Sequence, residues 1–121
     1  MKLDKIKQFN LFIIGVGNVG RKLLEQISNQ NNYVEKKLQI QLKIVGISNS
    51  KKMIFNNAGI NINNWQIELN SGEKTNELEF FNRTKKLNLR NSIFIDNTAS
   101  KIIASTYKYF LKNSINVITC N

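Results

Sequence analysis

Three glycines with the spacing Gly15-x-Gly17-x-x-Gly20 constrain the fold of this chain more than any other feature of its sequence. They follow the mainly apolar segment 9–14, which is typical of a strand buried on both faces of a parallel sheet. After them, apolar residues recur at helical spacing, at Val19, Leu23, Leu24 and Ile27. A glycine turn between a buried strand and a helix predicts a dinucleotide site; a glycine-rich turn in an unrelated α/β domain is the alternative.

Each glycine has a physical role in such a site. Gly15 permits the tight turn, Gly17 lets a pyrophosphate approach the backbone, and Gly20 lets helix and strand pack closely. The N-terminus of the following helix offers free N–H groups and the positive end of the helix dipole to the phosphates.

The rest of the chain alternates between strand and helix patterns. The expected elements are a polar loop at 29–32, a strand at about 38–47, a short strand or turn at 53–55, a short helix carrying Trp65 and Leu69 and capped by Asn63 or Asn64, a helix at 75–87 capped by Thr75, a strand at 92–96, a helix carrying Ile102, Ile103, Tyr107, Phe110 and Leu111, and a strand at 115–119. Trp65 and the pair Phe80-Phe81 are interpreted as core residues. This alternation predicts an α/β fold of the Rossmann type, a mainly parallel sheet with helices on both faces.

The length of the chain bounds its organisation. With 121 residues it is expected to form one domain, 1–121. A last strand without a covering helix after it suggests only the nucleotide-binding half of a larger protein, with the catalytic domain absent.

The end of the second strand bears on the choice of cofactor. An NAD site usually carries an acidic residue there, whereas a 2′-phosphate calls for a cation. This chain has Ser48-Asn49-Ser50 followed by Lys51 and Lys52, and no carboxylate. The segment therefore favours NADP, with NAD as the second choice, while two ordinary surface lysines are the alternative.

A polar segment, Asp96-Asn97-Thr98-Ala99-Ser100, follows the strand at 92–96. Ligands of open parallel sheets bind at this edge, so its small polar groups are expected to contact ribose or nicotinamide; helix capping by Thr98 or Ser100 is the alternative. Asp96 is given no catalytic role. Cys120 is interpreted as a spectator thiol, because the chain has no His to activate it. We therefore predict no catalytic residue and no metal site.

The net charge of +10 raises the alternative of a nucleic-acid-binding domain. We discount it because the lysines are scattered along the chain. No apolar run approaches the ~20 residues of a membrane span, and the N-terminus lacks a signal-peptide core. With one Cys in the chain, we expect a reducing compartment, the cytoplasm, and neither nucleic acid nor membrane as a partner.

Five stretches together resemble homoserine dehydrogenase, and most closely the dehydrogenase half of bifunctional aspartokinase–homoserine dehydrogenases. They are segments 10–20, 45–51, 59–65, 96–100 and 117–121. The resemblance implies an enzyme that uses NAD(P) to interconvert L-aspartate 4-semialdehyde and L-homoserine, in threonine and methionine biosynthesis.

The same resemblance implies roles for individual residues. The turn from Gly15 to Gly20, with Asn18 and Val19, would hold the pyrophosphate; Ser50 and Lys51 would lie near the adenosine ribose or its phosphate; Thr98, Ala99 and Ser100 would approach the nicotinamide; and Asn121 would match the asparagine of the family's asparagine–lysine motif. The lysine of that motif and the domain that follows it lie outside this chain. We therefore expect an inactive cofactor-binding fragment, whose partner is the missing catalytic domain or a second copy. A freestanding NAD(P)-sensing module is the alternative.

Overall fold

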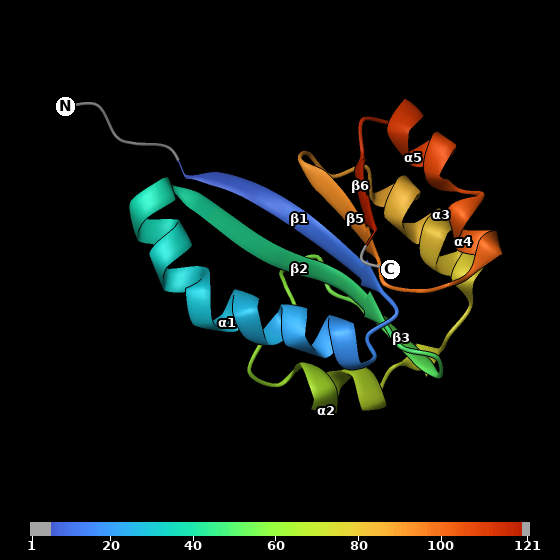
Figure 1. Ribbon diagram of the computed structural model, residues 1–121, viewed down its shortest axis with the longest axis horizontal. Coiled ribbons are helices and arrows are strands. Elements are labelled where there is room, and N and C mark those ends of the chain that lie inside the picture. The colour runs from blue at the N-terminus through green and yellow to red at the C-terminus, as the bar shows by residue number, and fades with distance from the viewer. Residues whose placement is uncertain (1–5, 120–121) are drawn as a thin grey trace.

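The computed structural model describes residues 6–119, which form one six-stranded sheet with helices on both of its faces (Figure 1). The strands are β1 (Lys7–Ile14), β2 (Ile40–Ser48), β3 (Lys52–Phe55), β4 (Glu73–Lys74), β5 (Ser92–Asp96) and β6 (Asn116–Thr119). The helices are α1 (Asn18–Leu38), α2 (Trp65–Asn70), α3 (Glu77–Leu87), α4 (Lys101–Ala104) and α5 (Tyr107–Lys112). None of the helices in this range is long and apolar enough to span a membrane.

The order of the strands in the sheet is β4-β3-β2-β1-β5-β6. Strands β2, β1, β5 and β6 run parallel, while β3 and β4 are antiparallel to their neighbours. The apolar strand β1 lies in the interior of the sheet, between β2 and β5, as its sequence predicts. A mainly parallel α/β sheet is therefore confirmed.

Alternate residues of β1 enter two separate hydrophobic cores, because successive side chains of a strand point to opposite faces. Leu11 and Ile13 pack in the core that α1 and α2 cover. Phe12 and Ile14 pack in the second core, beneath α3, α4 and α5. The residues of the helices that complete these cores are Leu24, Ile27 and Leu69 in the first and Phe80, Phe81, Ile103 and Phe110 in the second. The expected core positions of Trp65, which packs against the first core, and of the Phe80-Phe81 pair are confirmed.

Helix α1 differs from its expected extent. The predicted polar loop at 29–32 is wrong, because the helix continues through it to Leu38 and ends at Gln39, whose φ is 58°. The segment contains neither Gly nor Pro, so nothing in its backbone interrupts the helix, and Lys36 and Lys37 in the last turn complement the helix dipole. Val19, which helical spacing groups with the buried Leu24 and Ile27, is 55% exposed.

The two later helical segments also differ in detail. Helix α3 is capped by Asn76, whose side chain accepts from the backbone N–H of Glu79 at 3.0 Å, and not by Thr75. The single helix expected around 102–111 is divided into α4 and α5, with Ser105 and Thr106 between them. Ile102 and Leu111, which helical spacing groups with the buried Ile103 and Phe110, are exposed. The predicted strands at 53–55, 92–96 and 115–119 correspond to β3, β5 and β6.

Candidate functional site

The carboxyl ends of β1, β2 and β5 meet at one edge of the sheet. The register places Ile14 opposite Ser48 on one side and opposite Asp96 on the other. Each of these strands is followed by a polar or glycine-rich loop. Three segments that are far apart in the sequence therefore come together, at the edge where ligands of open parallel sheets bind.

Gly15 closes the turn after β1 in a conformation that favours glycine, with φ at +88°. Its N–H donates to the carbonyl of Ser48 at 3.0 Å, and the N–H of Val16 donates to the same carbonyl at 2.7 Å. A Cβ on Gly15 would lie 2.7 Å from Cγ2 of Thr98. The glycine therefore keeps the first turn close to both neighbouring loops.

The other two glycines of the motif differ in their surroundings. A Cβ on Gly17 would meet no atom within 4 Å, so the space beside this backbone is open. A Cβ on Gly20 would lie 3.1 Å from both the side-chain nitrogen of Asn97 and the carbonyl oxygen of Gly15. The roles predicted from the motif correspond to this geometry: a close contact at Gly20 and free access at Gly17.

The N-terminus of α1 is bare, in the sense that no side chain caps it. Gly17 is its N-cap and has no side chain to satisfy the first turn, which also contains no acidic residue. The N–H groups of Asn18, Val19 and Gly20 have no hydrogen-bond acceptor among the described residues. Unpaired N–H groups and the positive end of a 21-residue helix together favour an anion at this position.

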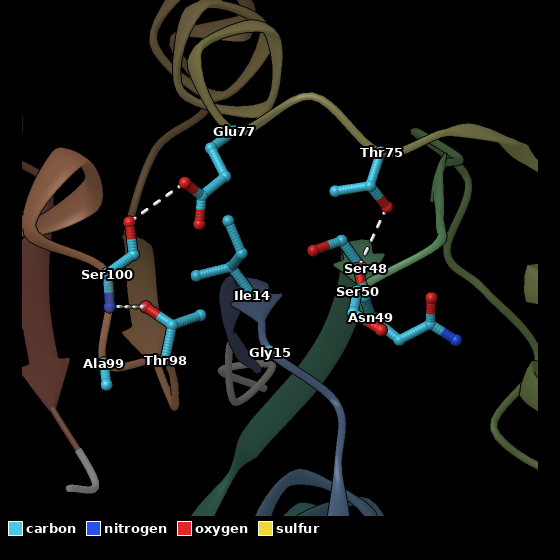
Figure 2. Close-up of a pocket in the computed structure, with 10 residues that line it drawn as sticks. All are labelled: Ile14, Gly15, Ser48, Asn49, Ser50, Thr75, Glu77, Thr98, Ala99 and Ser100. Carbon is cyan, nitrogen blue, oxygen red and sulfur yellow. Dashed lines mark hydrogen bonds between the residues drawn. The ribbon is translucent and has the colours of Figure 1, made fainter.

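A cavity of about 550 Å³ opens at the same edge (Figure 2). Its walls come from the ends of β1, β2 and β5 and from segment 75–77, which leads from β4 into α3. The lining residues are Ile14, Gly15, Ser48, Asn49, Ser50, Thr75, Glu77, Thr98, Ala99 and Ser100. Six residues singled out from the sequence are therefore gathered in one cavity: Gly15, Ser48, Ser50, Thr98, Ala99 and Ser100.

The remaining predicted site residues lie elsewhere. Gly17, Asn18, Val19 and Gly20 begin α1, outside the lining of the cavity. Lys51 is exposed and does not line the cavity. Asn121 lies outside the described residues.

One hydroxyl of the cavity wall, that of Ser48, is left without a hydrogen bond within residues 6–119. The residue is fully buried, and its Oγ has no hydrogen-bond partner among the described residues. A buried polar group without a partner costs free energy, so native structures rarely keep one without a reason. With the open space beside Gly17, this unpaired hydroxyl at the cavity wall fits a polar ligand that runs from the helix terminus into the cavity.

The loop after β5 is held by the buried carboxylate of Asp96. Its Oδ1 accepts from the N–H of Thr98 at 2.7 Å and from the hydroxyl of Thr98 at 2.6 Å. The hydroxyl of Tyr107 donates to the other oxygen. Burial, the hydrogen bond to Asp96 and the negative charge of Asp96 raise the pKa of Tyr107 to about 12. Asp96 therefore orders the loop, and Ser100 caps α4 by accepting from the N–H of Ile103 at 3.2 Å.

The cavity contains two residues that the sequence did not indicate. The hydroxyl of Thr75 donates to the carbonyl of Asn49 at 2.9 Å, and the carboxylate of Glu77 accepts from the hydroxyl of Ser100 at 2.9 Å. Both belong to segment 75–77, which runs from the end of β4 to the first residue of α3 and which no motif marks. The pairing of β4 with β3 brings this segment across the cavity, so only the tertiary structure reveals it.

The end of β2 carries basic residues but no acid. The side-chain oxygen of Asn49 accepts from the N–H groups of Lys51 and Lys52 at 2.8 and 2.7 Å, which shapes the turn. Nζ of Lys52 lies 3.5 Å from the carbonyl of Gly72.

The sheet is mainly parallel and has a glycine turn after its interior strand β1. Together with the uncapped N-terminus of α1 and the cavity along the carboxyl edge, these features define a dinucleotide-binding domain of the Rossmann type. Residues 15–121 match the family described as "Homoserine dehydrogenase, NAD binding domain". The chain belongs to this family. The predicted resemblance is thereby confirmed.

The chain is also similar to individual proteins in sequence or in fold. The chain is 34% identical, over 95% of its length, to a bifunctional aspartokinase/homoserine dehydrogenase of Buchnera aphidicola, and it spans 14% of that protein. A crystal structure of a Candida auris protein of unknown function shares the fold with a TM-score of 0.73 and 24% identity, over 93% of this chain and 30% of that one. A crystal structure of a homoserine dehydrogenase from Thermoplasma acidophilum also shares the fold, with a TM-score of 0.66 and 19% identity, over 93% of this chain and 35% of that one.

Proposed function

We propose that this chain is the NADP-binding part of a homoserine dehydrogenase, the enzyme that interconverts L-aspartate 4-semialdehyde and L-homoserine by hydride transfer. The observation that carries the proposal is the bare N-terminus of α1 beside the open space at Gly17, next to a cavity that extends along the ends of β1, β2 and β5. Membership of the family supports it.

The dinucleotide would lie along the carboxyl edge of the sheet. Its pyrophosphate would bind the N–H groups at the start of α1, from Asn18 to Gly20, where no acidic side chain opposes it. The adenosine ribose would lie at the end of β2, near Ser48 and Ser50, where the unpaired hydroxyl of Ser48 would gain a partner. The nicotinamide would lie toward the loop of Thr98 to Ser100 and, by the family resemblance, Asn121.

NADP is preferred to NAD because the end of β2 lacks the carboxylate that an NAD site usually places there. Lys51, which is exposed, and Lys52 follow the end of β2 closely in the sequence, and their ammonium groups would attract a 2′-phosphate.

The cofactor would supply the hydride, and this chain would bind and orient it. Hydride transfer also needs the aldehyde held against the nicotinamide and a proton donor nearby, and we place those groups in a catalytic domain of the same polypeptide or in a second copy. The isolated chain would then bind the cofactor, in the cytoplasm, without turning over homoserine.

The test is a titration of the purified chain with NADPH and NADH, followed by the fluorescence of the reduced nicotinamide. Replacing Lys51 and Lys52 by Ala should weaken NADPH by about tenfold or more and NADH by much less, since a charge-assisted hydrogen bond contributes about 1.5–3 kcal/mol. The matched control is Lys36→Ala with Lys37→Ala, an adjacent pair in the last turn of α1, at the other end of that helix from the glycine turn.

Each result has a definite meaning. Equal losses for both nucleotides in the Lys51/Lys52 variant would exclude the preference for NADP. Turnover of homoserine by the isolated chain would contradict the placement of the substrate-binding groups outside it. DNA binding that falls steeply with salt, without binding of either nucleotide, would favour the nucleic-acid alternative.

A further inference from the structure

Glu77, the first residue of α3, places a carboxylate inside the cavity. Figure 2 shows its side chain extending from the N-terminal turn of α3 toward the space between Ser100 on one side and Ser48 on the other. Among the ten described residues that line the cavity, Glu77 alone carries a charge. The cavity therefore has a single negative group in an otherwise neutral wall of hydroxyl, amide and apolar groups.

The position of this carboxylate is fixed from two sides. Its Oε1 accepts from the hydroxyl of Ser100 at 2.9 Å, and Ser100 is itself held as the N-cap of α4. At its own end, α3 is capped by the side chain of Asn76. The second oxygen of Glu77 makes no hydrogen bond to the described residues and remains available to the cavity.

The charge of Glu77 limits what binds beside it. A carboxylate repels phosphate, so the pyrophosphate belongs at the start of α1 and not at this end of the cavity. The bond to Ser100 instead places Glu77 at the end where the proposed function puts the nicotinamide. The nicotinamide ring is positively charged in the oxidised cofactor and becomes neutral when it accepts a hydride.

We infer that Glu77 sets the relative affinity of the site for the two redox states of the cofactor. Its carboxylate favours binding of the oxidised, cationic nicotinamide over the reduced, neutral one. The inference rests on the proposed function and assigns to Glu77 a role that the glycine motif and the basic end of β2 do not supply. A neutral side chain of the same shape would bind both redox forms more evenly.

The experiment compares the dissociation constants of NADP⁺ and NADPH, measured by isothermal titration calorimetry, for the wild-type chain and for Glu77→Gln. The amide oxygen of Gln still accepts from Ser100, so this variant removes the charge and keeps the loop in place. We expect NADP⁺ to weaken relative to NADPH by about tenfold, because two unit charges a few ångströms apart at a protein surface interact strongly enough for that change. Glu77→Lys should shift the ratio further in the same direction.

The matched control is Glu25→Gln, which removes an exposed carboxylate from α1 and should leave the ratio unchanged. An unchanged ratio in both Glu77 variants, with binding retained, would overturn the inference and leave the proposed function intact. An equal weakening of both redox forms would also overturn it, since it would indicate a contact with ribose. Failure of the wild-type chain to bind any pyridine nucleotide would overturn the proposed function, and this inference with it.

Discussion

Gly17→Ala separates the binding role of the glycine turn from its structural role. Apart from the two neighbouring residues in the chain, no described atom would lie within 4 Å of the added methyl group, and the φ of −99° at Gly17 does not require glycine. Ala is a poorer N-cap than Gly, and this lowers the free energy of unfolding by up to about 1 kcal/mol. Ala also restricts the unfolded chain more than Gly does, and this raises the free energy of unfolding by about 0.4–1 kcal/mol. The free energy of unfolding should therefore change by about 0.5 kcal/mol or less.

Binding should respond differently, because the methyl group occupies the space through which a phosphate approaches the N–H groups of α1. Losing one hydrogen bond to a charged phosphate costs about 1.5–3 kcal/mol, a loss of about 10- to 100-fold in affinity. NADPH and NADH should weaken equally, since both contain the pyrophosphate. The Lys51/Lys52 variant, in contrast, should affect mainly NADPH.

Urea unfolding followed by circular dichroism measures the stability of Gly17→Ala, and nucleotide fluorescence measures its affinity. The control is Val19→Ala, which shortens a side chain that is 55% exposed and keeps every N–H group of the first turn. If Gly17→Ala is as stable as the wild type and binds NADPH with unchanged affinity, the pyrophosphate does not lie at this turn.

Three further predictions concern the same edge of the sheet. Gly15→Ala should lower the free energy of unfolding by about 1–3 kcal/mol in urea, because its φ is +88° and its Cβ would lie 2.7 Å from Cγ2 of Thr98; an unchanged midpoint would contradict this. Ser48→Ala removes a buried hydroxyl that has no partner among the described residues. Thermal unfolding should therefore show equal or higher stability, while calorimetry should show weaker nucleotide binding. A loss of stability above about 1 kcal/mol would show that the Ser48 hydroxyl has a hydrogen-bond partner in the folded chain. The pKa of Tyr107 is about 12 in the folded chain and 10 in the unfolded chain. The protonated hydroxyl therefore contributes fully to the free energy of unfolding below pH 10, and this contribution is lost as the pH rises through 12. Tyr107→Phe should therefore flatten the decline of unfolding free energy between pH 10 and 12, and parallel declines in both chains would argue against the bond to Asp96.

The sequence indicates those features that depend on local requirements. The turn at Gly15 needs a backbone with positive φ, and this need is visible as a glycine after an apolar strand. The strand β1 is apolar because both of its faces are covered, and the alternation of strands and helices fixes the class of fold. Much of the candidate site follows from these features, because parallel strands end at a common edge.

Helix boundaries depend on smaller differences in free energy, and the sequence alone did not resolve them. The polar segment 29–32 has modest helix propensity but no helix breaker, so the helix continues. Thr75 and Asn76 are both acceptable caps. The structure uses Asn76, while the hydroxyl of Thr75 bonds to the loop after β2.

Taken alone, then, the sequence determined the glycine turn and the central strand, because these follow from local backbone geometry and from patterns of hydrophobicity. The resemblance of five sequence stretches indicated the family. Only the tertiary structure decided that Glu77 enters the cavity, that the hydroxyl of Ser48 is left without a partner, and that Val19 faces outward. Each of these depends on contacts between segments that are distant along the chain, and no local pattern encodes such contacts.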